Sequence, residues 1–232
     1  MHVWLLDLDD RARLPEETCR SWLSPEEKTR AERFTHPISR RGFILTRGYL
    51  KSLLGHYLGI APEDVELTIN AHGKPRLWQA GENEGLVFNL SHSGAMAALA
   101  FGYDTPLGID IEHLRPRGHP ERLASYSLSA VELDRWRLLG PVLRDESLIH
   151  YWNAKEAFVK AIGRGIALGL KQVVVAEDFQ GFQEVPMACE PASDWRLYQG
   201  QRHDYRYALV YQGPQRDLRF FHNEADIPIC PT

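Results

Sequence analysis

The sequence has few cysteines, and none of them are closely spaced. Cys19, Cys189 and Cys230 are the three in this chain of 232 residues, and they lie far apart. A disulfide framework or a zinc site needs paired or clustered thiols, so an odd number of scattered cysteines predicts neither. We therefore expect reduced thiols and a cytoplasmic protein.

Long apolar runs and an excess of positive charge are absent as well. No stretch approaches the roughly 20 apolar residues that a membrane-spanning helix needs, and the first residues do not resemble a signal peptide. The net charge is −4, whereas a general nucleic-acid-binding protein usually carries a strongly basic face. We expect neither a membrane nor a nucleic acid as a partner.

The composition that remains is that of a globular protein, with 44% hydrophobic and 25% charged residues. Its length suffices for one large domain or for two domains of about 100 residues each. The character of the sequence changes between Thr105 and Pro106, just before a second apolar strand. This change predicts an N-terminal half, residues 1–105, and a C-terminal half, residues 106–232.

Both halves begin with an apolar strand that ends in acidic residues, at residues 4–9 and 107–112, and continue with helices and then strands. This repetition predicts an α+β fold, a pseudo-dimer of two similar halves with the active site in the cleft between them. A chance similarity of two short apolar strands is the alternative. In the first half, we expect Ser91, His92 and Ser93 in a polar turn between two strands.

Residues 107–112 alternate between apolar and polar, which is the two-residue period of a strand. Asp110 and Glu112 therefore leave the same face. Two adjacent carboxylates repel each other, so either solvent or a hard divalent cation must neutralise them. Mg²⁺ is the usual partner of such oxygens, and Mn²⁺ is an alternative.

Residues 148–162 predict a helix that is apolar around most of its circumference and is therefore buried. Glu156 and Lys160 lie four residues apart on one face of it, and a buried charge needs a partner. We expect Glu156 to be the third oxygen ligand beside Asp110 and Glu112, with Lys160 facing the anion that the metal carries. A surface ion pair between Glu156 and Lys160 is the alternative.

Four segments in order carry a more specific pattern. Together they resemble the larger, single-chain 4′-phosphopantetheinyl transferases typified by the surfactin-synthetase activating enzyme. The segments are residues 73–75 (GKP), 88–93 (FNLSHS), 108–112 (GIDIE) and 152–160 (WNAKEAFVK), and the likeness extends to residues 24–34 and 128–132.

This resemblance implies a pseudo-dimer that binds coenzyme A and Mg²⁺ between its halves. The implied activity moves phosphopantetheine from coenzyme A to a serine of an apo carrier protein and releases adenosine 3′,5′-bisphosphate. Acyl, peptidyl or aryl carriers of fatty-acid, polyketide or peptide synthesis are the expected partners. By position, the resemblance implies catalytic roles for Glu156 and Lys160, metal ligation by Asp110, Glu112 and Glu156, and coenzyme contacts by Arg30, Lys74, Ser91, His92 and Lys160.

One position departs from the family pattern. Glu27 stands three residues before Arg30, where the surfactin-type pattern has a lysine, and Lys28 is the candidate replacement. The base that accepts the proton of the carrier serine is either Glu156 or a metal-bound water.

We expect a basic dock for the acidic carrier just beyond Glu112. Its members are Arg115, Arg117 and Arg122, with Leu123 and Tyr126 as apolar anchors. An internal duplication completes the site within one chain, so we expect a monomer.

Two other functions use the same residues. A metal-dependent hydrolase would cleave coenzyme A or a similar pyrophosphate with water and would need no protein partner. A non-catalytic module would bind coenzyme A or a carrier protein, but it would have no need for a third carboxylate at position 156.

Overall fold

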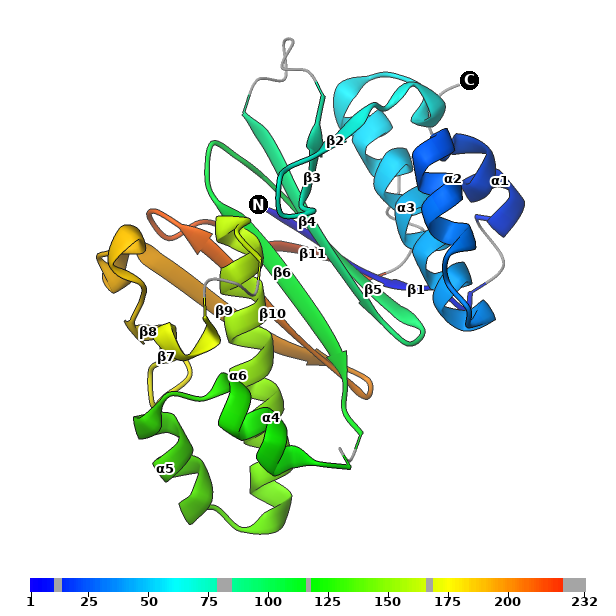
Figure 1. Ribbon diagram of the computed structural model, residues 1–232. Coiled ribbons are helices and arrows are strands. Elements are labelled where there is room, and N and C mark those ends of the chain that lie inside the picture. Colours follow the sequence, from blue (N-terminus) through cyan, green and yellow to red (C-terminus); the bar gives the residue numbers. More distant parts are fainter. Residues whose placement is uncertain (11–13, 79–84, 116–117, 166–168, 223–232) are drawn as a thin grey trace.

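The computed structural model describes residues 1–10, 14–78, 85–115, 118–165 and 169–222. It has an α+β structure, in which helices and antiparallel strands are combined and two sheets lie side by side (Figure 1). The α+β class predicted from the sequence is confirmed.

The described residues of the first part of the chain form three helices and five strands. In order these are β1 (His2–Asp7), α1 (Glu16–Trp22), α2 (Pro25–Glu32), α3 (Pro37–Leu58), β2 (Leu67–Ile69), β3 (Pro75–Leu77), β4 (Leu86–Ser93) and β5 (Met96–Tyr103), with a 3₁₀ turn at Pro62–Asp64. Helix α2 begins where the sequence predicts it, because Ser24 and Glu27 form a reciprocal capping box and Pro25 occupies the first turn. Helix α3 ends at Gly59, whose φ of 67° suits glycine.

The second part begins with a strand and contains the other long helix. Its elements are β6 (Leu107–His113), α4 (Pro120–Ser127), α5 (Ala130–Leu138), α6 (Pro141–Ile162), β7 (Val174–Val175), β8 (Phe182–Glu184), β9 (Trp195–Arg202), β10 (Tyr205–Gln212) and β11 (Arg219–Phe221), with 3₁₀ turns at Leu170–Gln172, Met187–Cys189 and Ala192–Asp194. Ser129 and Glu132 form a second capping box at α5. Helix α6 ends at Gly163, with a φ of 72°.

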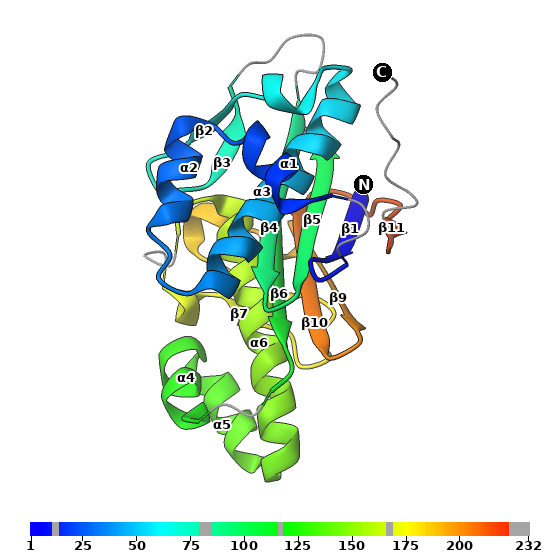
Figure 2. The same cartoon turned by 90° about the vertical axis from the view of Figure 1, so that its right-hand side faces the viewer.

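The two larger sheets have the strand orders β11-β1-β5-β4 and β6-β10-β9. In the first, β5 pairs antiparallel with β1 and β4, and in the second, β10 pairs antiparallel with β6 and β9. Strand β11 pairs in parallel with β1, so the end of the described chain returns to the first sheet (Figure 2).

Strands β4 and β6 belong to different sheets but run side by side (Figures 1 and 2). A side chain makes the connection: Asn89 Oδ1 accepts a hydrogen bond from the backbone N–H of Ile109 at 2.8 Å. Strand β4 extends through Ser93, so Ser91, His92 and Ser93 lie on a strand and the expected turn is wrong for them. The ladder with β5 continues to that end, with Ser93 opposite Met96.

Among the described residues, three apolar clusters hold these elements together. One packs α1 and α3 against β1, β4 and β5, and a second packs α4, α5 and α6 against β9 and β10. The third lies between the two sheets and includes Leu5, Ala98, Ile109 and Leu209, each completely buried. Burial of apolar surface from both sheets stabilises this junction. The packing of this shared core therefore fixes the position of β4 relative to β6.

Candidate active site

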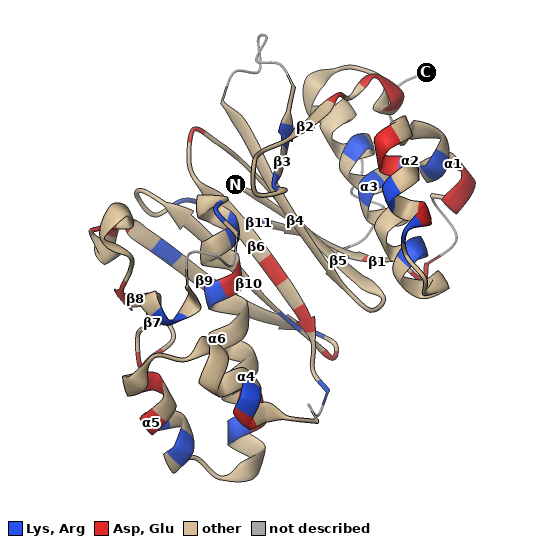
Figure 3. Ribbon diagram, viewed as in Figure 1, with Lys and Arg blue, Asp and Glu red and all other residues tan. Residues whose placement is uncertain are grey.

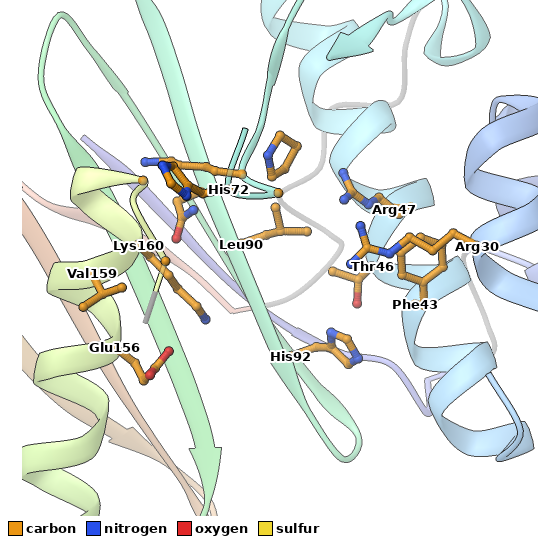
Figure 4. A pocket seen from close by; sticks show the side chains of 16 residues that line it. Arg30, Phe43, Thr46, Arg47, His72, Leu90, His92, Glu156, Val159 and Lys160 are labelled. Atoms are coloured by element: carbon orange, nitrogen blue, oxygen red, sulfur yellow. The ribbon is translucent and has the colours of Figure 1, made fainter. Parts of the chain in front are cut away.

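A cavity of about 300 Å³ lies between the two long helices. Figure 4 shows Glu156, Val159 and Lys160 of α6 on one side of it and Arg30 of α2 with Phe43, Thr46 and Arg47 of α3 on the other. Strand β4 lies between them and presents Asn89, Leu90 and His92, while the loop between β2 and β3 contributes residues 72–75.

Glu156 is an acid on a buried face of α6. Its side chain is 9% exposed, and burial raises its pKa to about 7, with additional contributions from the negative charges of Asp110 and Glu112. Lys160 opposes this shift and lowers the pKa, by less than burial raises it. A carboxyl group with a pKa near neutrality can accept or release a proton at physiological pH.

Lys160 connects α6 with both central strands. Its ammonium donates to Asp110 Oδ1 at 2.6 Å and to Ser91 Oγ at 2.8 Å, and Ser91 donates to Asp110 Oδ1 at 2.9 Å. Because Lys160 pairs with Asp110, and Glu156 is buried, the alternative of a surface pair between Glu156 and Lys160 is wrong. Asp110 and Ser91 hold the ammonium group of Lys160 at the cavity wall, where a ligand in the cavity would contact it.

The three acids have some of the properties of a divalent-cation site. Their oxygens are of the type that Mg²⁺ prefers, and the buried atoms Asp110 Oδ2 and Glu156 Oε1 have no hydrogen-bond partner in the protein. Glu112 is held by Ser93 Oγ, which donates to its Oε2 at 3.3 Å. Within the described part of the chain, however, no three acidic, histidine or cysteine side chains are gathered closely enough to hold a metal ion.

The wall opposite α6 is basic. The guanidinium groups of Arg30 and Arg47 both lie over the ring of Phe43, at 5.5 and 5.6 Å from its centroid. Arg47 is 6% exposed, and Glu27 lies 3.7 Å from it. Figure 3 shows basic segments on α2 and α3 and acidic segments on β6 across from them. An anion in the cavity would meet Arg30 and Arg47 on one side and Lys160, paired with Asp110, on the other.

Glu27 has a structural role in this wall. Besides capping α2, its carboxylate lies near Arg47 and Lys51, at 3.7 and 3.9 Å. Lys28 does not line the cavity, and its ammonium lies 3.5 Å from the carbonyl of Ser21. The candidate replacement for the missing lysine therefore points elsewhere, and Arg47 supplies the additional positive charge.

His92 stands in the cavity wall against α3. Its ring packs closely on Gly42, where a Cβ would lie 3.3 Å from Cδ2 and the ring would have to shift slightly. The imidazole is open to the cavity, yet protein surrounds most of it, and this burial, with the charges of Lys160 and Arg47, lowers its pKa. This lowered pKa favours the neutral imidazole, which can donate or accept a hydrogen bond.

Lys74 faces α6 rather than standing free in the cavity. Its ammonium donates to the carbonyls of Leu107 at 2.9 Å and Ala161 at 3.1 Å, and burial lowers its pKa to about 8. The structure thus brings together most of the residues singled out in the sequence. Arg30, Lys74, His92, Glu156 and Lys160 line one cavity, Ser91 and Asp110 are bonded to Lys160, and Glu112 lies farther along β6.

The residues expected to dock a carrier protein lie beyond the end of β6. Arg115, Arg122 and Tyr126 are exposed, and Tyr126 is 53% accessible. Leu123 packs partly buried against the C-terminal core, so it is not an exposed anchor. Arg117, like Cys230, lies outside the described residues.

Comparisons with known proteins identify the family to which the chain belongs. The family described as 4′-phosphopantetheinyl transferase, N-terminal, matches residues 16–102, and the 4′-phosphopantetheinyl transferase superfamily matches residues 106–210. The 4′-phosphopantetheinyl transferase HetI of Nostoc sp. is 38% identical over 176 residues, 76% of this chain and 73% of HetI. This chain belongs to the 4′-phosphopantetheinyl transferase superfamily.

Relatives from other bacteria extend the likeness. The 4′-phosphopantetheinyl transferase psf-1 of Bacillus pumilus is 32% identical over 188 residues, which cover 79% of this chain and 78% of psf-1. The 4′-phosphopantetheinyl transferase Sfp of Bacillus subtilis is 28% identical over 173 residues, 74% of this chain and 75% of Sfp. The resemblance based on four short segments is confirmed. Separately, none of the helices that the structure describes is long and apolar enough to cross a bilayer.

Sequence reasoning missed several residues that line the cavity of this superfamily member. Phe43, Thr46, Arg47 and Asn89 were not singled out as site residues, although all four face the cavity. A signal existed for Arg47, because a charged residue amid the apolar residues of α3 must find a partner. For Asn89, the signal was its place in the segment that also contains Ser91 and His92.

Proposed function

We propose that this chain transfers the phosphopantetheine group of coenzyme A to a serine of an apo carrier protein and releases adenosine 3′,5′-bisphosphate. The observation that carries the proposal is the bonded group of Lys160, Asp110 and Ser91 beside the buried acid Glu156. It is supported by family membership and by relatives that are named 4′-phosphopantetheinyl transferases. Attack by the carrier serine oxygen on the phosphorus that bears the pantetheine group breaks the pyrophosphate bond and frees the bisphosphate.

In this mechanism Lys160 stabilises negative charge on the pyrophosphate. Asp110 and Ser91 hold its ammonium in place, so the enzyme spends little reorganisation energy during the reaction. Removal of one such preorganised group typically lowers the rate by about 10² to 10³-fold. His92, neutral on the same cavity wall, is placed to hydrogen-bond a phosphate oxygen.

Glu156 is the base that we assign to the carrier serine. In the metal-free protein burial raises the pKa of Glu156 to about 7, and a bound cation would lower it. The unpartnered Oε1 of the ionised carboxylate is the atom that we assign to accept the hydroxyl proton. The nucleophile itself belongs to the partner, so the enzyme needs no serine nucleophile of its own.

We assign Asp110, Glu112 and Glu156 as the residues that would hold Mg²⁺, with Mn²⁺ as an alternative, although the described structure does not gather the three carboxylates into one group. Two unpartnered buried carboxylate oxygens support this assignment. When bound, the ion would neutralise charge on the pyrophosphate. The opposite wall would hold the anionic groups of coenzyme A, with Arg30 and Arg47 as cations over Phe43.

We further propose that the fold is a pseudo-dimer, with residues 1–105 mainly binding coenzyme A and residues 106–232 carrying the acids and the catalytic helix. Three observations support this division. The strand orders β1-β5-β4 and β6-β10-β9 are alike, α3 and α6 both contain 22 residues, and the two family matches meet between residues 102 and 106. The cavity then lies between the halves, and one chain completes the site without a second copy.

The carrier protein would dock beside the end of β6, where Arg115 and Arg122 are exposed together with Tyr126. Charge reversal at Arg115 should raise the KM for an acidic carrier and leave the KM for coenzyme A unchanged, because the residue lies outside the cavity lining. An unchanged KM for the carrier removes Arg115 from the dock.

The function is tested by intact-mass spectrometry of an apo carrier protein after incubation with the chain, coenzyme A and Mg²⁺. We expect a gain equal to one phosphopantetheine group, and no gain with Glu156→Gln. If coenzyme A is consumed while the carrier keeps its mass, the protein is a hydrolase. If coenzyme A stays intact and bound with every carrier tried, the chain is a binding module.

A further inference from the structure

The loop between β2 and β3 is organised by one side chain. Asn70 Oδ1 accepts hydrogen bonds from the backbone N–H groups of His72 and Lys74, both at 2.9 Å. The backbone of Asn70 completes the turn, since its carbonyl accepts from Gly73 N–H and its N–H donates to the Lys74 carbonyl. These bonds form a compact loop whose shape depends on the side chain of Asn70.

The same loop is fastened to the end of α6. Asn70 Nδ2 donates to the carbonyl of Gly163 at 2.9 Å, while Lys74 Nζ donates to the carbonyls of Ala161 and Leu107. The last carbonyls of a helix have no partner within the helix and carry its negative partial charge, so an amide and an ammonium are suitable donors for them. The fit is close, because a Cβ at Gly163 would lie 3.1 Å from Lys74 Cδ and 3.2 Å from Asn70 Nδ2.

This contact reaches the residues of the site directly. Lys160 immediately precedes Ala161, and Glu156 lies on the turn before it, so any movement of this end of α6 moves both side chains. Leu107 begins β6, the strand that carries Asp110. One ammonium group therefore fixes the ends of both elements that bring Asp110 and Lys160 within 2.6 Å of each other.

We propose that Asn70 and Lys74 are positioning residues that fasten the β2–β3 loop to α6 and hold Glu156 and Lys160 in register with Asp110. The proposal rests on the proposed function for its rate measurement. It assigns to Lys74 a role different from the coenzyme contact that the family resemblance implies. Because residues 72–75 of the loop also line the cavity, a coenzyme resting on the loop meets a surface already joined to the catalytic helix.

The test uses two variants that break the connection from opposite sides. Lys74→Met removes the ammonium and keeps the length of the side chain. Asn70→Asp keeps an oxygen for the loop N–H groups but replaces the donor to Gly163 with a second oxygen. Arg76→Gln is the matched control, since Arg76 is exposed on the same hairpin. Coenzyme affinity is measured by calorimetry, transfer by steady-state kinetics, and motion of α6 by hydrogen exchange without a carrier.

Both variants should lower kcat by about 10- to 100-fold, because a displacement near 1 Å at a reacting centre costs that much. We expect the Kd for coenzyme A to stay within about threefold of the wild type and the amides of residues 159–163 to exchange faster. Arg76→Gln should change none of these values. If Lys74→Met instead weakens coenzyme binding while Asn70→Asp leaves kcat and exchange unchanged, Lys74 is a ligand contact and the proposal is wrong.

The exchange result is independent of the transferase assignment. Protection of residues 159–163 that is the same in both variants as in the wild type would overturn the proposal whatever reaction the protein catalyses. Faster exchange in the variants, together with a wild-type protein that modifies no carrier, would support the positioning role and disprove the proposed function. If Lys74→Met gives too little folded protein, Asn70→Asp decides alone, because it preserves the bonds within the loop.

Discussion

The two long helices, α3 and α6, each bury a lysine near a capping-box glutamate. The two ion pairs differ in the distance between their charged atoms and in their burial. Lys155 of α6 lies 2.5 Å from Glu132 Oε2, and neither side chain is exposed at all. Lys51 of α3 lies 3.9 Å from Glu27 Oε2, and Glu27 remains 13% exposed. Each lysine also donates to a carbonyl farther along the chain, Lys155 to that of Leu170 and Lys51 to that of Val65.

The difference follows from what else each glutamate contacts. Glu132 accepts hydrogen bonds from the backbone N–H groups of Ser129 and Val175, so all its bonds serve the folded core. Glu27 shares its charge between Lys51 and Arg47, and Arg47 lines the cavity. We infer that the pair in the C-terminal half fixes α6 rigidly, whereas the cluster in the N-terminal half can rearrange when an anion enters.

The largest expected effect is the loss of the buried pair. Glu132→Ala leaves the ammonium of Lys155 buried without its counter-charge, which should lower the free energy of unfolding by about 3–5 kcal/mol. Urea denaturation followed by circular dichroism measures this change. The double variant Glu132→Leu/Lys155→Met removes both charges and should regain much of the loss. A loss of less than about 1 kcal/mol of unfolding free energy in Glu132→Ala would mean that water reaches the ion pair.

The acidic residues of β1 and β6, the strands that precede these helices, also differ in burial. Asp9, just beyond β1, is exposed and pairs with Arg41 at 3.0 Å, whereas Asp110 on β6 is 4% exposed and holds Lys160. Asp110→Asn should lower kcat/KM for transfer by about 10² to 10³-fold, because Lys160 loses its fixed counter-charge. Asp9→Asn is the matched control and should retain wild-type kinetics. Equal losses in both variants would show that the burial of Asp110 has no role in the reaction.

Local signals allowed these features to be predicted in part. Both capping boxes could be recognised at Ser24 and Ser129, because a cap depends on residues that are three positions apart. The burial of α6 followed from its apolar circumference, and the isolated charges of Glu156 and Lys160 on it indicated a site. These inferences succeeded because each cause lies within a few residues of its effect.

Features set by distant contacts were not predicted. That Lys160 pairs with Asp110, and not with Glu156, depends on how β6 packs against α6. The return of β11 to β1 joins the two ends of the described chain, and no periodicity indicates such a pairing. Strand β4 continues through Ser93 because β5 and β6 both bond to it, although the residues themselves favour a turn.

A pH-dependent effect separates α6 from α3, since α3 contains no acidic residue and α6 buries Glu156. The pKa of Glu156 is raised to about 7, so the native state keeps a proton there that the unfolded chain loses at lower pH. Stability of the metal-free protein is therefore lost as pH rises from about 4.5 through 7. Glu156→Gln removes this penalty and should stabilise the metal-free protein by on the order of 2 kcal/mol at pH 8.

The measurement is the difference in urea midpoint between Glu156→Gln and the wild type in the presence of a chelator, at pH 8 and at pH 4.5. We expect the difference to be small at the lower pH, where the carboxyl group is protonated in the folded protein and about half protonated in the unfolded chain. A variant that is less stable than the wild type at pH 8 would mean that the Glu156 carboxylate is compensated in the folded protein, contrary to its unpartnered Oε1.

The smallest effect tests the looser pair directly. Glu27→Gln keeps a side-chain oxygen for the capping box and removes the charge shared by Lys51 and Arg47, so it should cost about 1 kcal/mol of unfolding free energy, well below the cost of Glu132→Ala. Because Arg47 then loses a competing partner, the Kd for coenzyme A should fall slightly. Calorimetry and urea denaturation measure the two quantities. A stability loss as large as that of Glu132→Ala would show that both clusters are equally rigid, and the inferred division between a fixed and an adaptable helix would be wrong.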